Sequence, residues 1–229
     1  MVKHLACIMD GNRRWATKQG WIPWHGHRKG LDAVRLVVGF CLKKEIPFLT
    51  LYAFSTENLK RSKEEQDYLF EVLAKEAARE FEEFKRQNVR VRFIGDRSLF
   101  PKSVRSLCEN LEKDTAHCDA LQLNFLFCYG GQQEIVDTAK RIAIKVKKGD
   151  LQVADITSEL FEHFLWTATM PSPDLIIRTG SHRRLSNFLS YQSAYSDFYF
   201  LDCLWPDISN NDLESAIAYY NDCQKNFGK

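Results

Sequence analysis

The chain has 229 residues, of which 45% are hydrophobic, and its 32 basic and 30 acidic residues leave a net charge of +2. This length and composition predict one globular domain with a substantial buried core. The near balance of charge excludes a general nucleic-acid binder and directs attention to local charge clusters. Seven cysteines without a C-x-x-C spacing indicate buried, reduced thiols rather than a disulfide framework or a zinc site.

The chain shows no sign of a membrane span or of a second domain. No apolar run reaches membrane-spanning length, and the apolar stretch near Met1 is too short for a signal peptide. No linker, low-complexity segment or internal repeat interrupts the sequence. We therefore expect a soluble cytoplasmic protein with a single domain over residues 1–229.

Short apolar or alternating runs, typical of β-strands, recur along the chain and are separated by helix-like stretches. In chain order, the expected strands are 4–9, 47–54, 89–95, 121–129, 174–179 and 197–202. The clearest helix covers 64–87. Its apolar face consists of Leu69, Val72, Leu73, Ala77, Phe81 and Phe84. This alternation predicts an α/β fold whose central, mostly parallel six-stranded sheet is flanked by helices.

Polar residues gather where the expected strands end. Ligands of open α/β sheets bind beyond the carboxyl ends of the strands, so this edge is the predicted site. The first strand is followed by residues 10–12 (Asp-Gly-Asn), the second by 55–58 (Ser-Thr-Glu-Asn) and the fifth by Arg178 and 179–181. Asp197 lies at the entrance to the sixth strand.

Two segments near these ends carry cations without any acid. The cations are Arg13, Arg14, Lys18, Arg28 and Lys29 within residues 11–31, and Arg178, Arg183 and Arg184 within residues 175–196. Guanidinium groups and backbone N–H groups bind phosphate oxygens, so two such segments predict two anionic groups bound together. Carboxylates beside phosphate sites commonly hold Mg²⁺. We therefore expect Asp10, which precedes the first segment, to bind a metal that bridges to phosphate.

Each feature alone also has an ordinary structural explanation. An Asp-Gly-Asn sequence after a strand is commonly a turn and helix cap, and a cationic run is commonly a solvated face. His25 and His27 lack the further ligands that a metal site needs. Neither nucleotide-binding glycine motif is present. Their joint placement at strand ends nevertheless favours a Mg²⁺-dependent enzyme acting on two phosphorylated substrates.

Several stretches resemble the cis-prenyltransferases, in the same order and over practically the whole chain. They are IMDGNRRWA, GHRKG, LYAFSTENLKRS, NVRVRFIGD, NFLFCYGG, DLIIRTG, RRLSNFLSYQSAYSDFYF and LWPD. The most similar members are the bacterial ones that make undecaprenyl diphosphate. The resemblance implies repeated condensation of isopentenyl diphosphate onto farnesyl diphosphate with Mg²⁺ as cofactor, to give the precursor of the lipid carrier for cell-wall glycans.

The resemblance also implies roles for individual residues. Asp10 matches the metal-binding catalytic aspartate, and Asn58 matches the residue assigned as proton acceptor. Binding of the allylic diphosphate is implied for Gly11, Asn12, Arg13, Arg14 and Trp15, with His27 close behind them. A second substrate-contacting loop is implied for Ser55, Thr56 and Glu57, with Arg61 as a nearby phosphate contact. Binding of isopentenyl diphosphate is implied for Arg178, Arg184, Leu185 and Ser186. Asp197 matches the second metal-associated carboxylate, which is normally a glutamate, and Pro23 replaces an arginine found in many members.

A long apolar product requires a dry channel, because each exposed CH₂ group costs about 0.8 kcal/mol. We expect an apolar tunnel with Ala53 and two helices as its walls. The helical wall residues are Val34, Val37, Val38 and Cys41 in one helix, and Leu69, Val72 and Leu73 in the other. In the family that the chain resembles, bulky residues near Ala53 accompany short products, and long-chain dolichol-type members carry an insertion between residues 61 and 96. Since Ala53 is small and this insertion is missing, the resemblance implies a product of undecaprenyl length.

The resemblance implies partners as well. A homodimer is expected through residues 193–207, whose aromatic side chains exceed what an edge strand needs. Such a product also predicts peripheral contact with the inner face of the cytoplasmic membrane. The alternative is a non-catalytic accessory subunit of a cis-prenyltransferase complex. Those subunits lose the catalytic aspartate motif, whereas Asp10 is present in this chain.

Overall fold

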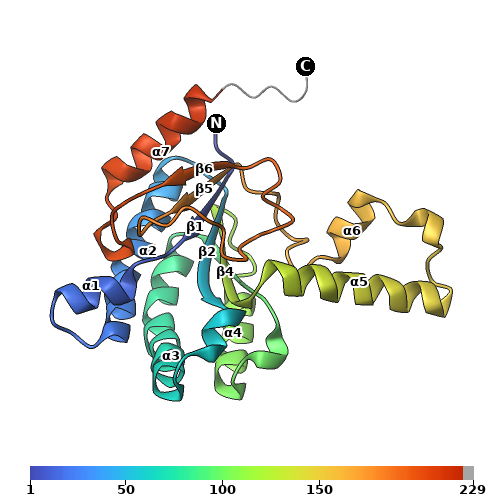
Figure 1. Cartoon of the computed structure of the whole chain (residues 1–229), viewed down its shortest axis with the longest axis horizontal. Helices are drawn as coiled ribbons and strands as arrows, with labels where there is room; N and C mark the ends of the chain where they lie inside the picture. The colour runs from blue at the N-terminus through green and yellow to red at the C-terminus, as the bar shows by residue number, and fades with distance from the viewer. Residues whose placement is uncertain (224–229) are drawn as a thin grey trace.

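The computed structural model describes residues 1–223, apart from the side chains of residues 73–81. Six strands form one sheet in the order β3-β4-β2-β1-β5-β6, and each neighbouring pair is parallel (Figure 1). The strands are β1 (His4–Ile8), β2 (Phe48–Ser55), β3 (Val89–Ile94), β4 (Leu121–Tyr129), β5 (Leu175–Arg178) and β6 (Asp197–Phe200). The predicted α/β fold with a six-stranded sheet is confirmed, and this sheet is parallel throughout.

Helices and short 3₁₀ turns connect the strands. The helices are α1 (Asn12–Lys18), α2 (Gly26–Lys43), α3 (Lys63–Arg86), α4 (Lys102–Asp114), α5 (Gly131–Lys148), α6 (Ser158–Phe164) and α7 (Asn210–Asp222). The 3₁₀ turns are η1 (Pro23–His25), η2 (Thr56–Lys60), η3 (Arg97–Leu99), η4 (Val153–Asp155) and η5 (Trp205–Asp207).

The sheet is buried on both faces, which explains why its strands read as nearly continuous apolar runs. On one face, Leu5 and Leu51 are fully buried in a core that includes apolar residues of α2, α3, α4 and α7. On the other face, Ile8 and Leu126 pack beneath Phe188 and Leu189 of the loop after β5. Burying each such side chain contributes about 2 kcal/mol, so the strands are held from both sides.

Helix α3 agrees closely with the predicted helix at 64–87. It begins after Ser62, whose hydroxyl accepts a hydrogen bond from the Glu65 N–H at 3.3 Å, as expected of an N-cap. Of its predicted apolar face, Phe84 is buried in the core, and Leu69 and Val72 line a cavity. The side chains of Leu73, Ala77 and Phe81 lie outside the described residues.

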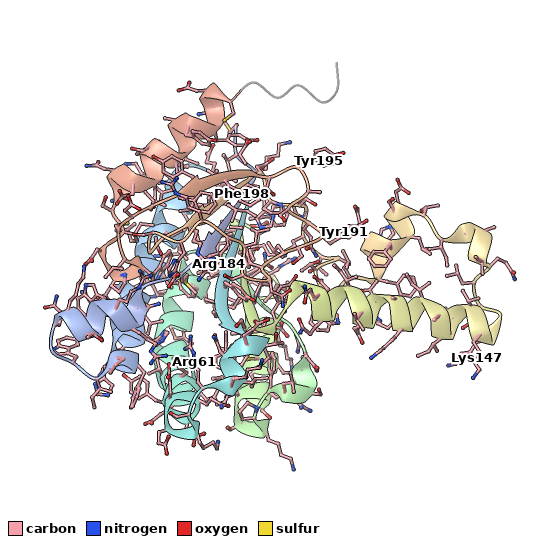
Figure 2. All side chains as sticks on the ribbon, viewed as in Figure 1. Arg61, Lys147, Arg184, Tyr191, Tyr195 and Phe198 are labelled. Carbon is pink, nitrogen blue, oxygen red and sulfur yellow. The ribbon has the colours of Figure 1, made fainter. Side chains whose placement is uncertain are left out.

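Helices α5 and α6 form an arm that projects sideways from the body of the molecule (Figure 1). Figure 2 shows Lys147 at the far end of this arm and Tyr191 at its base. The Tyr191 ring packs against Phe161 of α6, with ring centroids 5.3 Å apart. Gly149, in the left-handed conformation at φ 78°, ends α5 and reverses the chain.

Two bulk properties can be stated for the described residues. The seven cysteines are all free thiols, and five of them are buried, as their spacing predicted. Among the described helices, none is both long and apolar enough to cross a lipid bilayer.

Candidate active site

Loops that follow three adjacent strands meet at the carboxyl edge of the sheet. The register pairs Ile8 in β1 with Arg178 in β5, and Cys7 in β1 with Leu51 in β2. A cavity of about 690 Å³ lies among these loops, α2 and α3, and Figure 2 labels two of its arginines, Arg61 and Arg184. Its polar lining consists of Asp10, Asn12, His27, Tyr52, Ser55, Glu57, Asn58, Arg61, Arg178, Arg184, Ser186 and Asn187. The structure therefore brings most of the predicted site residues together.

Asp10 is held in place from several sides. Its Oδ2 accepts a hydrogen bond from Arg178 Nη2 at 3.0 Å, and its Oδ1 accepts one from Arg14 Nη2 at 3.2 Å. Its backbone oxygen accepts hydrogen bonds from Thr179 Oγ1 at 2.7 Å and from the Trp205 N–H at 3.0 Å. The carboxylate is thus fixed in orientation, while its side chain keeps 27% of its surface exposed.

Arg178 organises the loop that follows β5. Its side chain is only 4% exposed, and its Nη1 donates to Ser186 Oγ at 2.9 Å and to the backbone oxygen of Arg184. Its buried Nε has no hydrogen-bond partner among the described residues. Arg178 therefore connects Asp10 to this loop through its two Nη atoms, and its Nε–H is a donor that the described residues leave unused.

The turn into α1 requires glycine. Gly11 has a φ of 112°, and a Cβ there would lie 3.0 Å from the Cα of Leu204. The turn presents Asn12, whose Nδ2 donates to the Met9 carbonyl at 3.1 Å and whose buried Oδ1 has no partner among the described residues. A Cβ on Gly30 would lie 2.4 Å from that Oδ1, so this glycine makes room for the amide.

Two arginines, Arg13 of α1 and Arg61 just before α3, lie close together at the buried carboxylate of Glu65. Glu65, which is 3% exposed, pairs with Arg61 at 3.1 Å and with Arg13 at 3.6 Å. Next to them, burial and the charges of Arg61 and Arg13 lower the pKa of His27 to about 3. His27 is therefore neutral at physiological pH, and its buried Nε2 has no partner among the described residues.

The loop after β2 is arranged by its own side chains. Asn58 Oδ1 accepts a hydrogen bond from the Ser55 N–H at 3.1 Å, and the Ser55 side chain in turn accepts one from the backbone N–H of Asn58. This reciprocal capping pair occupies the carbonyl oxygen of the Asn58 amide. The NH₂ group of Asn58 is therefore the part available to a ligand, and it is a hydrogen-bond donor.

Several predicted residues lie outside the cavity lining. They are Gly11, Arg13, Arg14, Trp15, Thr56 and Leu185. Trp15 donates from Nε1 to Asp207 at 2.7 Å and packs edge-on against Trp21. Leu185 packs against the core cluster on the face of the sheet that contains Ile8. These two side chains support the loops instead of facing the cavity.

The expected pairing of Asp197 with Asp10 is wrong within one chain. Asp197 is the first residue of β6 and pairs in register with Leu175, the first residue of β5. The entrance of a parallel strand lies at the edge of the sheet opposite its exit, where Asp10 follows β1. With about 3.3 Å per residue along a strand, the two carboxylates cannot share one ion in a single chain.

The available carboxylates fit a metal ion that is shared with a substrate. Within the described part of the chain, no three His, Cys, Asp or Glu side chains come close enough to hold a metal by themselves. The cavity does present two carboxylates, Asp10 and Glu57. Mg²⁺ takes one or two protein carboxylates and completes its shell with water and substrate phosphates.

The far side of the cavity is apolar. Its wall consists of Ile8, Met9, Leu31, Val34, Ala53, Phe54, Leu69, Val72, Phe125, Phe127 and Trp205. Four of the predicted tunnel residues belong to it, namely Val34, Ala53, Leu69 and Val72. Val37, Val38 and Cys41 are instead buried in the main core, because only one face of α2 reaches the cavity. A tunnel that continues from this wall stays a prediction.

Two residues of the polar lining, Tyr52 and Asn187, had no role in the sequence prediction. The hydroxyl of Tyr52 donates to the backbone oxygens of Tyr129 at 3.3 Å and Ser186 at 3.4 Å. Asn187 joins three loops through its amide. Its place directly after Ser186, in a loop at a strand end, was the available signal, since asparagine is favoured at left-handed turn positions.

Comparison with known proteins agrees with this geometry. The family described as "Putative undecaprenyl diphosphate synthase" matches residues 8–228. The tritrans,polycis-undecaprenyl-diphosphate synthase (geranylgeranyl-diphosphate specific) of Methanocaldococcus jannaschii is 45% identical over 99% of this chain and 82% of its own length. The ditrans,polycis-undecaprenyl-diphosphate synthase ((2E,6E)-farnesyl-diphosphate specific) of Photorhabdus laumondii is 42% identical over 99% of this chain and 89% of its own length.

A solved structure gives the same result for the fold. Lavandulyl diphosphate synthase from Lavandula x intermedia, in complex with dimethylallyl diphosphate, superimposes with a TM-score of 0.90 and 32% identity. The match covers 100% of this chain and 98% of that one. Fold, site and relatives together place the chain in the undecaprenyl diphosphate synthase family of cis-prenyltransferases, and it is a transferase of prenyl groups.

Proposed function

We propose that this enzyme condenses isopentenyl diphosphate repeatedly onto farnesyl diphosphate to give undecaprenyl diphosphate, the precursor of the lipid carrier for cell-wall glycans. The observation that carries the proposal is a single cavity with a cationic rim at the strand ends and an apolar wall behind it. Two diphosphates fit the rim, and a growing polyprenyl chain fits the wall. Relatives specific for farnesyl and for geranylgeranyl diphosphate both support a long allylic starter.

Asp10 would hold the Mg²⁺ ion together with oxygens of the diphosphates, since its carboxylate is fixed by Arg178 and Arg14 and is partly exposed. The ion would act as a Lewis acid that neutralises charge on the departing diphosphate. Asp197 is not part of this site.

The protein's own cations would neutralise the remaining diphosphate charge. Arg61 and Arg184 line the cavity from opposite loops, and Arg178 keeps one unused Nε–H. His27, neutral because its pKa is lowered to about 3, can donate or accept a hydrogen bond without adding charge. Such donors, placed before the reaction starts, stabilise charge that develops as the allylic C–O bond breaks.

The new bond forms between the terminal alkene carbon of isopentenyl diphosphate and C1 of the allylic substrate, and a proton then leaves C2. A neutral amide is a weak base, and the carbonyl oxygen of Asn58 already accepts the Ser55 N–H. We infer that Asn58 orients a substrate through its NH₂ group. The proton would pass to a diphosphate oxygen. The pKa of the protonated diphosphate lies in the range of a useful general base.

Chain length is attributed to the apolar wall. Ala53 is small and lies on this wall with Val34 and Leu69, which leaves room for a growing chain. A tunnel continuing past these residues would keep the product out of water until it reaches undecaprenyl length.

A homodimer is proposed through residues 193–207. Strand β6 is at the edge of the sheet, and Figure 2 labels Phe198 in this strand and Tyr195 just before it. Tyr195 is 84% exposed and Phe200 is 36% exposed, which is unusual for aromatic residues of an unpaired edge. The long product further supports a cytoplasmic enzyme that contacts the membrane surface peripherally.

A turnover assay with isopentenyl diphosphate tests the proposal. Farnesyl and geranylgeranyl diphosphates should be compared as starters, each with Mg²⁺ and with a chelator. We expect Mg²⁺-dependent release of diphosphate and a product of undecaprenyl length from farnesyl diphosphate. A folded protein without turnover on either starter would favour the accessory-subunit alternative.

A further inference from the structure

Asn187 connects loops that belong to different strands. Its Oδ1 accepts a hydrogen bond from the Gln132 N–H at 2.8 Å, and its backbone oxygen accepts one from the Gly131 N–H at 2.8 Å, both at the start of α5. Its Nδ2 donates to Glu57 Oε1 at 2.9 Å and to Gln133 Oε1 at 2.9 Å. The loops after β2, β4 and β5 are therefore joined at this one side chain.

The surroundings of Asn187 are shaped for this role. Its φ of 65° lies in the left-handed region, which asparagine and aspartate adopt more readily than most residues. A Cβ on Gly130 would lie 2.7 Å from Asn187 Nδ2 and 2.1 Å from Gln133 Oε1, so a larger residue there would displace these two side chains. The left-handed backbone of Asn187 and the close packing at Gly130 together fix the position of the Asn187 amide.

Although Asn187 lines the cavity, its hydrogen-bonding groups are engaged by the protein. Both N–H bonds of its amide have acceptors, and its oxygen has a donor. An amide offers two donors and one acceptor oxygen, so no donor is left for a substrate. This distinguishes Asn187 from Asn58, whose NH₂ group has no such commitment.

Both loops joined by Asn187 carry groups expected to contact substrate: the loop after β2 is the second substrate-contacting loop, and the loop after β5 is assigned to isopentenyl diphosphate. Glu57 precedes Asn58 in the loop after β2, and Asn187 follows Ser186, which Arg178 holds in the loop after β5. We propose that Asn187 is a positioning residue whose hydrogen bond to Glu57 sets the separation of these two loops and hence of the two reacting carbons. This inference rests on the proposed function for the assignment of substrate contacts to these loops.

Bond formation is sensitive to such a separation. A misplacement of about 1 Å between reacting groups can reduce the rate by about 100-fold, while each substrate still binds. Loss of the connection should therefore lower kcat and leave the KM of both substrates nearly unchanged. A direct contact to one substrate would instead raise the KM of that substrate.

The test uses Asn187→Asp, which keeps the shape, the acceptor oxygen and the tolerance of a positive φ. It replaces two N–H donors with an acceptor that faces the Glu57 carboxylate. In the double variant with Glu57→Gln, the new glutamine can donate to the aspartate and restore the connection. We expect kcat of Asn187→Asp to fall by about 10- to 100-fold, with each KM within about 3-fold of the unmodified enzyme. The kcat of the double variant should rise toward the kcat of Glu57→Gln alone.

Asn88→Asp is a matched control. Asn88 also has a positive φ, of 60°, and its amide also pairs with a carboxylate residue, Asp119, at 2.6 Å. It precedes β3 at the opposite edge of the sheet. We expect kcat of this variant to match that of the unmodified enzyme.

Three kinetic outcomes would overturn the proposal: an unchanged kcat in Asn187→Asp, a rise in the KM of one substrate alone, or a double variant no better than Asn187→Asp. Amide hydrogen exchange provides a readout that does not depend on turnover. Exchange should become faster in Asn187→Asp in both loops, 55–60 and 184–188, and in neither loop in Asn88→Asp. If the unmodified enzyme fails to use the proposed substrates, the proposed function is wrong. If amide exchange in Asn187→Asp stays as slow as in the unmodified enzyme in both loops, the proposed connection through Asn187 is wrong.

Discussion

The guanidinium of Arg178 lies 3.0 Å from the carboxylate of Asp10, and this contact joins the end of β5 to the residue that follows β1. Arg178 is almost fully buried, whereas Asp10 is partly exposed, so the pair has one anchored and one accessible member. The same arginine also holds the loop of Arg184 and Ser186. The ion pair thus fixes the proposed metal ligand and one substrate loop in a single arrangement.

The first prediction concerns the charge of Asp10. Asp10→Asn keeps the side-chain shape but removes the anion that would bind Mg²⁺, so we expect kcat to fall by about 100-fold or more. Turnover and circular dichroism should be measured together to separate chemistry from folding. Asp32→Asn is a suitable control, because Asp32 pairs with Lys29 and Arg35 on an exposed surface. Near-normal turnover in folded Asp10→Asn would contradict the metal assignment.

The second prediction separates two arginines of the same loop region. Arg184→Ala should mainly raise the KM for isopentenyl diphosphate, since Arg184 lines the cavity and its guanidinium makes no hydrogen bond to another of the described residues. Arg178→Ala should also lower kcat and stability, because it leaves Asp10 and Ser186 without their buried partner. Steady-state kinetics and urea unfolding measure both effects. If only the KM for farnesyl diphosphate rose, the assignment of the two substrates to their sites would be the wrong way round.

The third prediction is a loss of stability in acid caused by His27. Its pKa falls from 6.5 to about 3 on folding, because burial and then the charges of Arg61 and Arg13 disfavour the protonated ring. Between these pH values the unfolded chain binds a proton that the folded chain does not. The free energy of unfolding should therefore decrease as the pH falls from 6.5 toward 3, by up to about 1.4 kcal/mol per pH unit from this residue.

Urea unfolding at several pH values would measure this slope in the unmodified protein and in His27→Gln. The slope should be smaller in the variant. His4 acts in the same direction, since its pKa is lowered to about 4, chiefly by burial, so a residual slope should persist in His27→Gln. Equal slopes in the two proteins would show that His27 titrates normally when folded.

The fourth prediction concerns product length. Ala53→Leu adds three carbons to the apolar wall beside Val34 and Leu69, so the product distribution should shift to shorter chains. The KM for farnesyl diphosphate should change little and serves as the internal control. Mass spectrometry of the extracted products gives the result. An unchanged length would mean that the growing chain does not pass Ala53.

The fifth prediction concerns the edge strand. Light scattering should give twice the 26.7 kDa mass of one chain, and Phe200→Asp should lower this value by placing a charge on β6. Leu99→Asp, at a similarly exposed apolar residue near the other edge of the sheet, should leave the mass unchanged. A monomer at micromolar concentration would contradict the proposed homodimer.

The sequence predicted the elements better than it predicted their contacts. Strand β4 was expected at 121–129 and occupies Leu121–Tyr129, because its apolar run has clear polar and glycine boundaries. Asp197 does not meet Asp10 within one chain, because the entrance of a parallel strand lies at the edge of the sheet opposite the strand ends where Asp10 is found. Val37 and Val38 were assigned to a tunnel because helical periodicity defines the apolar face of a helix. It does not show whether that face packs on the core or lines a cavity. Asn187 was missed because its importance arises from residues 130 positions and about 55 positions earlier in the chain.

The central position of β1 has a consequence for the synthesis of this protein. β1 is the first strand to leave the ribosome, yet its two neighbours are β2 and β5, and Leu5 pairs with Leu175 near the other end of the chain. The Lys3 N–H likewise donates to Asp174, 171 residues later. Until that late segment emerges, one side of β1, the strand that Asp10 follows, has no partner. Folding with such distant contacts is slow and exposes unpaired strand edges, so nascent chains of this enzyme should depend on chaperones until their last quarter has been made.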